Sequence, residues 1–288
     1  MKNFLTSGLL AFGLMAATPI LAQETIRFAV TDIDGMEALQ REMGPFKDAF
    51  EAASGLNVEF FPVSGRTVAV EAMAAEQIDF VLTGPAEYVV FNARLDAQPV
   101  VTWIRPDYFS NVVVLEASPY QSADDLKGAK VSFGEIGSTS QHLAPVALLA
   151  DAGLTYSVDY EPVFLKRNVA VEALVAGDIA AIGLNRTHID QISKAFPDQK
   201  FRMLLKGDQL PNDLLLVSPK VSPAVVDIVR KTFAEQGETL MAAVTSVDEN
   251  AKYIGGRFDA SVTDRDYDVV RKMFENVGVT EFNEFVGQ

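Results

Sequence analysis

The stretch that offers the most chemistry is residues 134–145, which read G-E-I-G-S-T-S-Q-H-L-A-P. A strand pattern precedes it and a helical pattern follows, so Ser138, Thr139 and Ser140 stand where a helix begins. The first backbone N–H groups of a helix are unpaired and carry partial positive charge, and hydroxyl groups add further donors. A single capping serine is the plain alternative. Three consecutive hydroxyls after a glycine favour an oxyanion-binding site.

His142 lies one helical turn beyond Ser138, which raises the alternative of a secreted Ser-dependent hydrolase with a Ser–His pair. The sequence has no G-x-S-x-G turn, and no acidic residue nearby would orient the histidine. We therefore predict no catalytic residue and expect His142 to pack or hydrogen-bond beside the ligand. Two histidines and no cysteine give no zinc spacing, so we predict no metal and no cofactor.

The elements that must position these residues alternate along the chain. This alternation is typical of an α/β fold in which helices cover a mostly parallel sheet. No Gly/Ser-rich linker separates the parts, so we expect two lobes that share crossing strands. Strand patterns lie at 26–30, 58–63, 79–82, 112–115, 130–134, 180–184 and 214–217, and helical patterns include 36–53, 67–75, 85–94, 169–176, 223–235 and 238–243.

The N-terminal residues have the pattern of an export signal. A positive start at Lys2 is followed by an apolar run over 4–17 and a short exit that ends at Ala22, where we expect cleavage. The apolar run is shorter than the roughly 18–20 residues that span a bilayer. The net charge of −15 argues against a nucleic-acid or anionic-membrane partner, but not against a small anion, whose site is built from local donors. Because no cysteine could carry a lipid anchor, we expect a free periplasmic protein.

Several motifs together point to one family. The most specific is x-x-G-S-T-S-x-x-L-x-P at 135–145, and D-L-K-G-A-K-V precedes it at 125–131. Supporting motifs are G-P-A-E-Y at 84–88, Y-F-S-N-V at 108–112, P-N-D at 211–213 and D-Y-D-V-V-R at 266–271. Nearly the whole mature chain resembles the phosphonate-, phosphite- and phosphate-type periplasmic binding proteins of ABC importers, the PhnD-like family.

The resemblance implies roles for individual residues. Ser138, Thr139 and Ser140 match the hydroxyls and amides that bind the oxyanion in such proteins. Tyr88 matches an aromatic residue that the first lobe contributes to the cleft wall. Asp213 matches an acidic residue near the ligand.

Two positions depart from the family pattern because they carry arginine. Arg167 stands where related proteins often have a ligand-facing histidine, and Arg66 lies in a loop that often offers a tyrosine. A guanidinium can bind an oxyanion through two parallel N–H bonds and stays charged, so we predict that both contact the ligand and favour a compact, fully charged oxyanion. The plain alternative is an exposed surface arginine. Arg105 and Arg186 are further candidates by position.

The resemblance implies a two-lobed type II periplasmic binding protein fold, with a mixed, mostly parallel sheet flanked by helices in each lobe and a cleft between the lobes. We assign 1–22 to the signal peptide, 23–111 and 207–288 to lobe 1, and 112–206 to lobe 2. We predict a monomer that captures phosphite, phosphonate or phosphate by hinge closure and delivers it to an ABC permease of the inner membrane. The alternative is a ligand-sensing periplasmic partner of a membrane histidine kinase.

Overall fold

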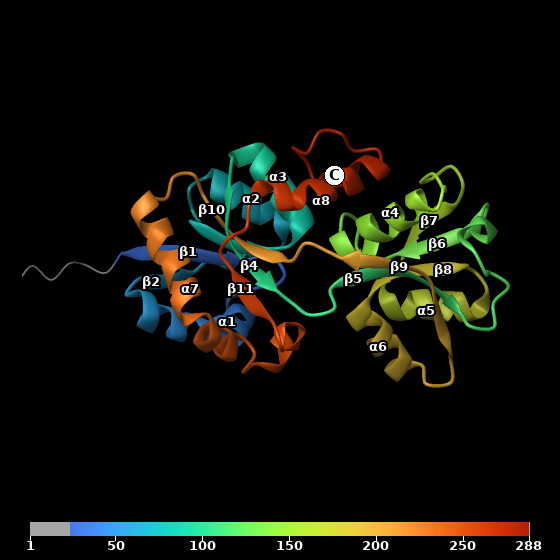
Figure 1. Cartoon of the computed structure of the whole chain (residues 1–288), viewed down its shortest axis with the longest axis horizontal. Helices are drawn as coiled ribbons and strands as arrows, with labels where there is room; N and C mark the ends of the chain where they lie inside the picture. Colours follow the sequence, from blue (N-terminus) through green and yellow to red (C-terminus); the bar gives the residue numbers. More distant parts are fainter. Residues whose placement is uncertain (1–23, 288) are drawn as a thin grey trace, which may run out of the picture.

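The structure is a computed structural model that describes residues 24–287, so the export signal expected at 1–22 lies outside the described residues. Two α/β lobes lie side by side along the long axis of the molecule, each built on one sheet (Figure 1). Across residues 24–287, none of the helices combines the length and the apolar character needed to cross a membrane.

Lobe 1 is built on a six-stranded mixed sheet with the strand order β11-β4-β10-β3-β1-β2. β1 runs parallel to both of its neighbours, whereas β10 and β11 run antiparallel to the strands beside them. The strands are β1 (Thr25–Val30), β2 (Asn57–Phe60), β3 (Phe80–Thr83), β4 (Gln98–Ile104), β10 (Asp213–Val217) and β11 (Arg257–Asp259).

Lobe 2 is built on a five-stranded mixed sheet with the strand order β7-β6-β8-β5-β9. β6 runs parallel to β7 and β8, and β5 runs antiparallel to β8 and β9. In both lobes most antiparallel pairs involve β5 or β10, because these strands enter their lobe from the other one. The strands are β5 (Phe109–Leu115), β6 (Lys130–Phe133), β7 (Glu161–Phe164), β8 (Ala181–Asn185) and β9 (Phe201–Gln209).

Two short segments connect the lobes, namely 105–108 between β4 and β5, and 210–212 between β9 and β10. These strand bounds lie about three residues outside the limits of 112 and 206 that we expected for lobe 2. The division of the chain into lobes therefore stays a proposal, with 109–209 as the refined extent of lobe 2. Because both connections are short, they can act as a hinge.

The helices cover both sheets, and α1, α2, α3, α5 and α7 begin within two residues of the predicted starts, whereas α6 was not predicted. α1 begins at Met36, and its buried residues Leu39, Met43, Phe46 and Phe50 recur at the spacing of one helical face. The helices are α1 (Met36–Ser54), α2 (Arg66–Ala74), α3 (Pro85–Leu95), α4 (Ala144–Asp151), α5 (Arg167–Ala176), α6 (Arg186–Ala195), α7 (Pro223–Val244) and α8 (Asp268–Asn276).

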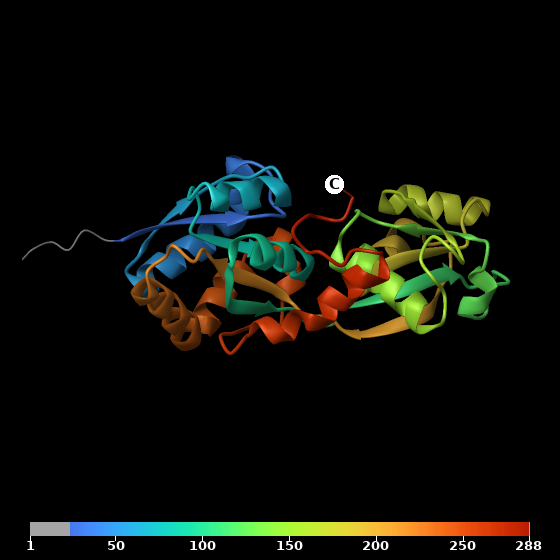
Figure 2. The same ribbon diagram turned by 90° about the horizontal axis from the view of Figure 1, so that it is seen from above.

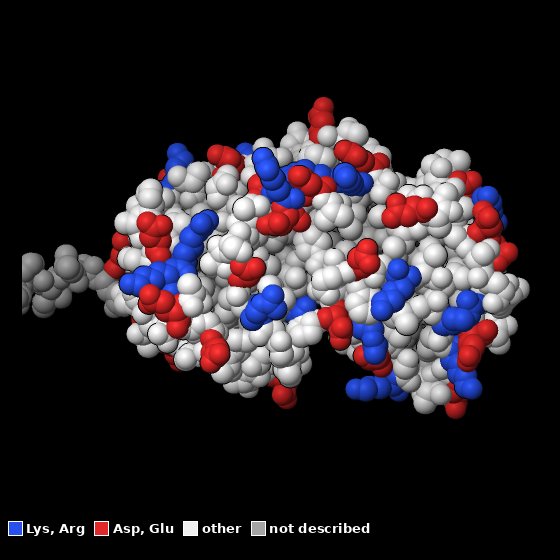
Figure 3. Space-filling view, viewed as in Figure 1, with Lys and Arg blue, Asp and Glu red and all other residues white. Residues whose placement is uncertain are grey.

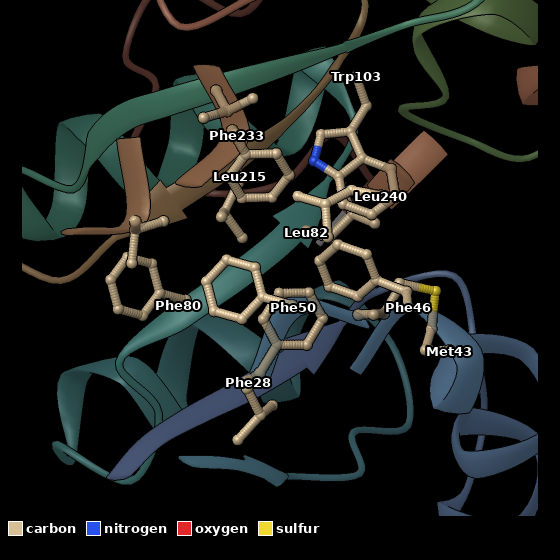
Figure 4. Packing of buried hydrophobic residues seen from close by; sticks show 14 of the residues in the cluster. Phe28, Met43, Phe46, Phe50, Phe80, Leu82, Trp103, Leu215, Phe233 and Leu240 are labelled. Atoms are coloured by element: carbon tan, nitrogen blue, oxygen red, sulfur yellow. The ribbon is translucent and has the colours of Figure 1, made fainter. Parts of the chain in front are cut away.

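Aromatic side chains fill the core of lobe 1 between the sheet and helices α1 and α7 (Figure 4). Phe28, Phe46, Trp103 and Phe233 are each at most 2% exposed. The Phe46 ring lies 5.1 Å from the Trp103 ring in an edge-on arrangement and 6.0 Å from the Phe233 ring. Burial of such a ring stabilises by about 2–3 kcal/mol, and an edge-on pair adds about 1 kcal/mol. Lobe 1 therefore gives the residues on its surface a rigid base.

Helix α8 lies between the lobes, and the C-terminal segment continues from it over the space between them (Figure 2). α8 packs against α3 of lobe 1 and against α4 of lobe 2. Its buried residues Val270 and Phe274 share one apolar cluster with residues of both helices. The lobes are thus connected by an apolar contact as well as by the two crossing segments.

Candidate functional site

A cavity of about 880 Å³ lies between the two lobes, and most of the residues that line it are polar. The candidate residues Arg66, Ser138, Thr139, Ser140 and Asp213 all line it. Lobe 2 contributes Glu135, Ile136, Ser138, Thr139, Ser140, Gln141, Asn185 and His188.

The loop after β6 forms most of the lobe 2 wall. It turns at Gly137, whose φ of +79° lies in the left-handed region that glycine adopts without strain. A π-helical turn, η2 (Thr139–Leu143), follows and continues into α4, while the carbonyl of Ser138 accepts hydrogen bonds from the N–H groups of His142 and Leu143. The start of a helix leaves its first N–H groups without helical partners. Here the helix starts at Thr139, which lines the cavity.

The hydroxyl groups of Thr139 and Ser140 are held by hydrogen bonds that they accept. The Oγ1 atom of Thr139 accepts from the backbone N–H of Ala86 at 3.0 Å, a contact between the two lobes. The Oγ atom of Ser140 accepts from the side-chain amide of Asn185 at 3.2 Å. A hydroxyl that accepts through its oxygen keeps its O–H group as a donor. Thr139 in particular can therefore donate to an anion in the cavity.

Three more helices begin at the cavity wall. α2 starts after Gly65, α3 after Gly84 and α6 after Asn185, and these three residues line the cavity. Each helix is 9 to 11 residues long, and its N-terminus carries a partial positive charge. Helices from both lobes therefore direct positive potential into one space.

Most charged side chains of the cavity are paired with one another. Arg66 pairs with Glu87 at 3.0 Å and also with Glu135 of lobe 2, so it connects the lobes. Arg105 pairs with Asp213 at 3.2 Å, and Lys252 lies 3.6 Å from Asp213 and 3.8 Å from Asp32. Asp34 lines the cavity as well, which gives five carboxylates against these three cations.

The surface carries both acidic and basic side chains, as the cavity does. Lysine and arginine side chains are interspersed with aspartate and glutamate on the face shown in Figure 3. An anion that approaches this face meets no extended basic patch, so local donors rather than long-range charge must bind it.

Burial and neighbouring charges shift the pKa values of groups in the wall. Desolvation raises the pKa of Glu87 to about 7, because it outweighs the favourable effect of Arg66. Desolvation also raises the pKa of Tyr108 to about 12. For Asp213, burial opposes ionisation, but Arg105, Lys252 and the Tyr253 hydroxyl together hold its pKa below the usual range. Near neutral pH, Asp213 is ionised, Tyr108 is neutral, and Glu87 is partly protonated.

The structure does not bring Arg167 to the cavity, which corrects our expectation for this residue. Arg167 is the first residue of α5, and its guanidinium donates to Gln191 on α6. His188 of α6 does line the cavity, and Arg167 lies near enough to it to help lower its pKa. Arg186 does not line the cavity either and pairs with Asp190 on its own helix.

Tyr88 is also absent from the cavity wall, although Gly84, Pro85 and Glu87 of the same segment line it. Its hydroxyl donates to Asp264 at 2.6 Å, and its ring meets Tyr267 edge-on at 4.7 Å. The side chain is completely buried. Tyr88 faces the C-terminal part of lobe 1, because α3 turns this side away from the cleft, so its contribution is to packing.

His142 supports the binding loop from behind. Its Nδ1 atom accepts a hydrogen bond from the Gly137 N–H at 3.0 Å, and its Nε2 atom lies 3.3 Å from the Tyr156 hydroxyl. Burial lowers its pKa to about 4, which keeps the ring neutral and Nδ1 available as an acceptor. Both ring nitrogens are engaged away from Ser138 and Ser140, so this geometry provides no base for a serine nucleophile.

Several residues of the wall were not among the predicted binding residues. Glu87, Lys252 and Asp32 were missed because their positions depend on tertiary pairing. Asn185 and His188 carry a signal that could have identified them, since they follow a strand at the start of a helix, as Ser138 does. His188 has a pKa lowered to about 3 by burial and by the nearby Arg167 and Arg105.

The molecule has two mixed sheets flanked by helices, and two crossing segments join them around one polar cavity. This arrangement defines a two-lobed substrate-binding protein of the type II kind. A model of the family described as "ABC transporter, phosphonate, periplasmic substrate-binding protein" matches residues 28–267. The chain belongs to this family. It is therefore a binding protein and not an enzyme, and the hydrolase alternative is wrong. The family implies a location outside the cytoplasm, a small-molecule ligand and a membrane permease.

Individual proteins are similar to this chain in sequence or in fold. The chain is 26% identical over 282 residues to the phosphate-import protein PhnD of Mycolicibacterium smegmatis. The aligned region covers 88% of this chain and 86% of that protein. XAC2383 from Xanthomonas citri bound to ATP matches with a TM-score of 0.69 at 17% identity, over 89% of this chain and 98% of that chain. PhnD1 from Prochlorococcus marinus in complex with methylphosphonate matches with a TM-score of 0.67 at 14% identity, over 88% and 98%. These structural similarities show the fold.

Proposed function

We propose that this protein captures a small phosphorus oxyanion, namely phosphonate, phosphite or phosphate, in the cavity between its lobes. The observation that carries the proposal is the start of the π-helical turn at Ser138, Thr139 and Ser140. There, hydroxyl and amide donors face the same cavity as the N-termini of α2, α3 and α6. Such uncharged donors bind an oxyanion without a free cation.

The excess of carboxylates favours phosphorus over sulfur. A phosphorus oxyanion keeps an ionisable proton near neutral pH, with a second pKa of about 6 in phosphate esters. Such a ligand can donate a hydrogen bond to Glu87, which lines the cavity. Sulfate and sulfonates carry no such proton near neutral pH, so they could only accept from the protonated fraction of Glu87 and would be repelled by its ionised fraction. The name of one relative in sequence, which refers to phosphate import, agrees with this preference.

Capture proceeds by hinge motion at 105–108 and 210–212. In the closed form, Arg66 of lobe 1 reaches Glu135 of lobe 2, and Ala86 reaches Thr139, so these contacts stabilise closure together with the ligand. The loaded monomer then docks on an ABC permease of the inner membrane. Residues 1–22 direct export to the periplasm and are removed after Ala22.

Isothermal titration of the ligand-stripped protein tests this proposal with phosphite, phosphate, methylphosphonate, 2-aminoethylphosphonate, arsenate and sulfate. We expect saturable one-to-one binding of at least one phosphorus oxyanion and no binding of sulfate. A chain without the first 22 residues, purified in a buffer free of phosphate, is the sample. Binding of sulfate alone, or of none of these anions, would contradict the proposal.

A further inference from the structure

The C-terminal segment beyond α8 forms part of the cavity wall. Phe285, Val286 and Gly287 line the cavity together with Ile136. We take this side as the mouth, because the Glu135 side chain is 70% exposed and Ile136 is 40% exposed there. The segment lies beyond residue 267, where the match to the family model ends. The role of this segment therefore does not follow from the residues that match the family model.

The segment packs closely against the loop that carries the binding hydroxyls. A Cβ atom added to Gly287 would lie 2.6 Å from Cγ2 of Ile136, so only glycine permits this approach. A Cβ atom added to Gly137 would lie 3.5 Å from Cβ of Val286 and 3.4 Å from Nη1 of Arg66. Arg66 and the C-terminal segment therefore both lie close beside Gly137 of the loop.

Apolar side chains anchor the segment before it reaches the loop. Phe282 packs edge-on against Phe274 of α8, with 5.7 Å between ring centroids. Phe285 is only 6% exposed and belongs to the apolar cluster that contains α8 and α3 residues. Val286 and Gly287 follow this anchor, so they are the residues free to contact the mouth.

We propose that residues 280–287 form a strap that closes the mouth of the cleft and slows ligand release, through the contact of Val286 and Gly287 with Ile136 and Gly137. The inference rests on the proposed function, because it assigns a role to residues of the same cavity. A ligand that leaves past Ile136 must first break this contact. Ile136 stays 40% exposed, so the contact is small. Loss of one or two buried methyl groups corresponds to a dissociation rate about 3- to 10-fold higher.

Two variants remove the contact from opposite sides. A chain that ends at Phe285 keeps the anchor and lacks Val286 and Gly287, and Ile136→Ser removes the apolar side chain that the strap contacts on lobe 2. The matched control is Val158→Ser, because Val158 is 78% exposed on lobe 2 and does not line the cavity. Release of methylphosphonate is measured by stopped-flow fluorescence. We expect each variant to release about 3- to 10-fold faster, and the combined variant to release no faster than either alone. Unchanged rates, or effects that multiply, would overturn the strap.

Hydrogen exchange in the ligand-free protein gives a second readout that does not depend on any ligand. The strap covers Gly137, so we expect the amides of residues 136–138 to exchange faster in both variants than in the wild type and in Val158→Ser. Equal exchange in all four proteins would refute the strap. If the wild type binds no phosphorus oxyanion, the proposed function fails, while exchange still decides the strap.

Discussion

The lobe 2 wall and the lobe 1 wall meet at one cavity but differ in chemistry. Lobe 2 presents uncharged donors, chiefly Ser138, Thr139 and Ser140, on a turn braced by the neutral His142. Lobe 1 and the crossing segment present charged residues that already pair, such as Arg66 with Glu87 and Arg105 with Asp213. The difference indicates a division of roles, in which lobe 2 holds the anion and lobe 1 sets the charge and the closure of the cleft.

Of these substitutions, Thr139→Ala in the lobe 2 wall should have the largest effect on ligand affinity. It removes a donor to the anion and the hydrogen bond that Ala86 donates across the lobes. We expect affinity for the preferred anion to fall about 10- to 100-fold, since a hydrogen bond to a charged group contributes about 1.5–3 kcal/mol. Calorimetric titration measures the change, and Thr139→Ser, which keeps the hydroxyl, should restore most of it. An unchanged affinity would remove the hydroxyl from the site.

Glu87→Gln tests the charge state of the lobe 1 wall through the pH dependence of the free energy of unfolding. The pKa of Glu87 is raised from 4.5 to about 7 in the folded protein, so folding is favoured by protonation of this group. Its contribution is fully present below pH 4.5 and is lost as pH rises through about 7. We expect the wild-type free energy of unfolding to lose about 2 kcal/mol from this group between pH 5 and 7.

The measurement is urea unfolding at several pH values, with the variant and wild type compared at each. Because glutamine does not titrate, the stability of Glu87→Gln relative to the wild type should increase as pH rises from 5 to 7. Histidines that titrate in the same range are common to both proteins and cancel in the difference. A difference that stays constant with pH would show that the Glu87 carboxyl is not perturbed.

Arg66→Met tests whether the paired charges of lobe 1 act through charge. The substitution leaves Glu87 and Glu135 without their cation, and both carboxylates would then repel an anion. We expect affinity to fall about 3- to 10-fold, with a larger loss at low ionic strength. Glu135→Gln is the matched control, since it breaks the same bridge but removes a negative charge. Equal losses in both variants would mean that the bridge itself, rather than the charge, controls affinity.

Arg167→Leu and Tyr88→Phe should have the smallest effects on binding. Neither side chain lines the cavity, so we expect affinity to change by less than about twofold, the size of a typical surface effect. Tyr88→Phe loses the hydrogen bond to Asp264 and should reduce stability by about 1 kcal/mol. Titration and urea unfolding separate the two effects. A large loss of affinity in Arg167→Leu would return this arginine to the site, as the sequence suggested.

Much of the fold could be predicted because local periodicity carries it. Seven strands and most helix starts follow from alternating and helical apolar spacing, and the turn at 134–145 identified the start of a helix at the cavity. The strands β4, β7, β9 and β11 and helix α6 were not predicted. The expected helices at 223–235 and 238–243 are joined in α7, with non-helical backbone at Gln236. The break between the two patterns corresponds to this kink.

The parts of the site that sequence could not predict depend on tertiary contacts. Tyr88 and Glu87 are adjacent in the chain, yet one is buried against Tyr267 and the other lines the cavity. Which side of α3 faces the cleft is decided by α8, which lies far along the chain. Arg167 was expected at the ligand because it stands where related proteins often have a ligand-facing histidine, but its guanidinium donates to Gln191 and the residue does not line the cavity. The pairing of Arg105 with Asp213 likewise joins residues that are distant in sequence.

The most direct test of the division between the walls is a crystal structure of the protein with methylphosphonate. Our account predicts phosphonate oxygens within hydrogen-bond distance of the Thr139 hydroxyl and of backbone N–H groups at the start of the π-helical turn, with Arg105 still paired to Asp213. A phosphonate bound through a free guanidinium of lobe 1, with the lobe 2 hydroxyls out of reach, would contradict it.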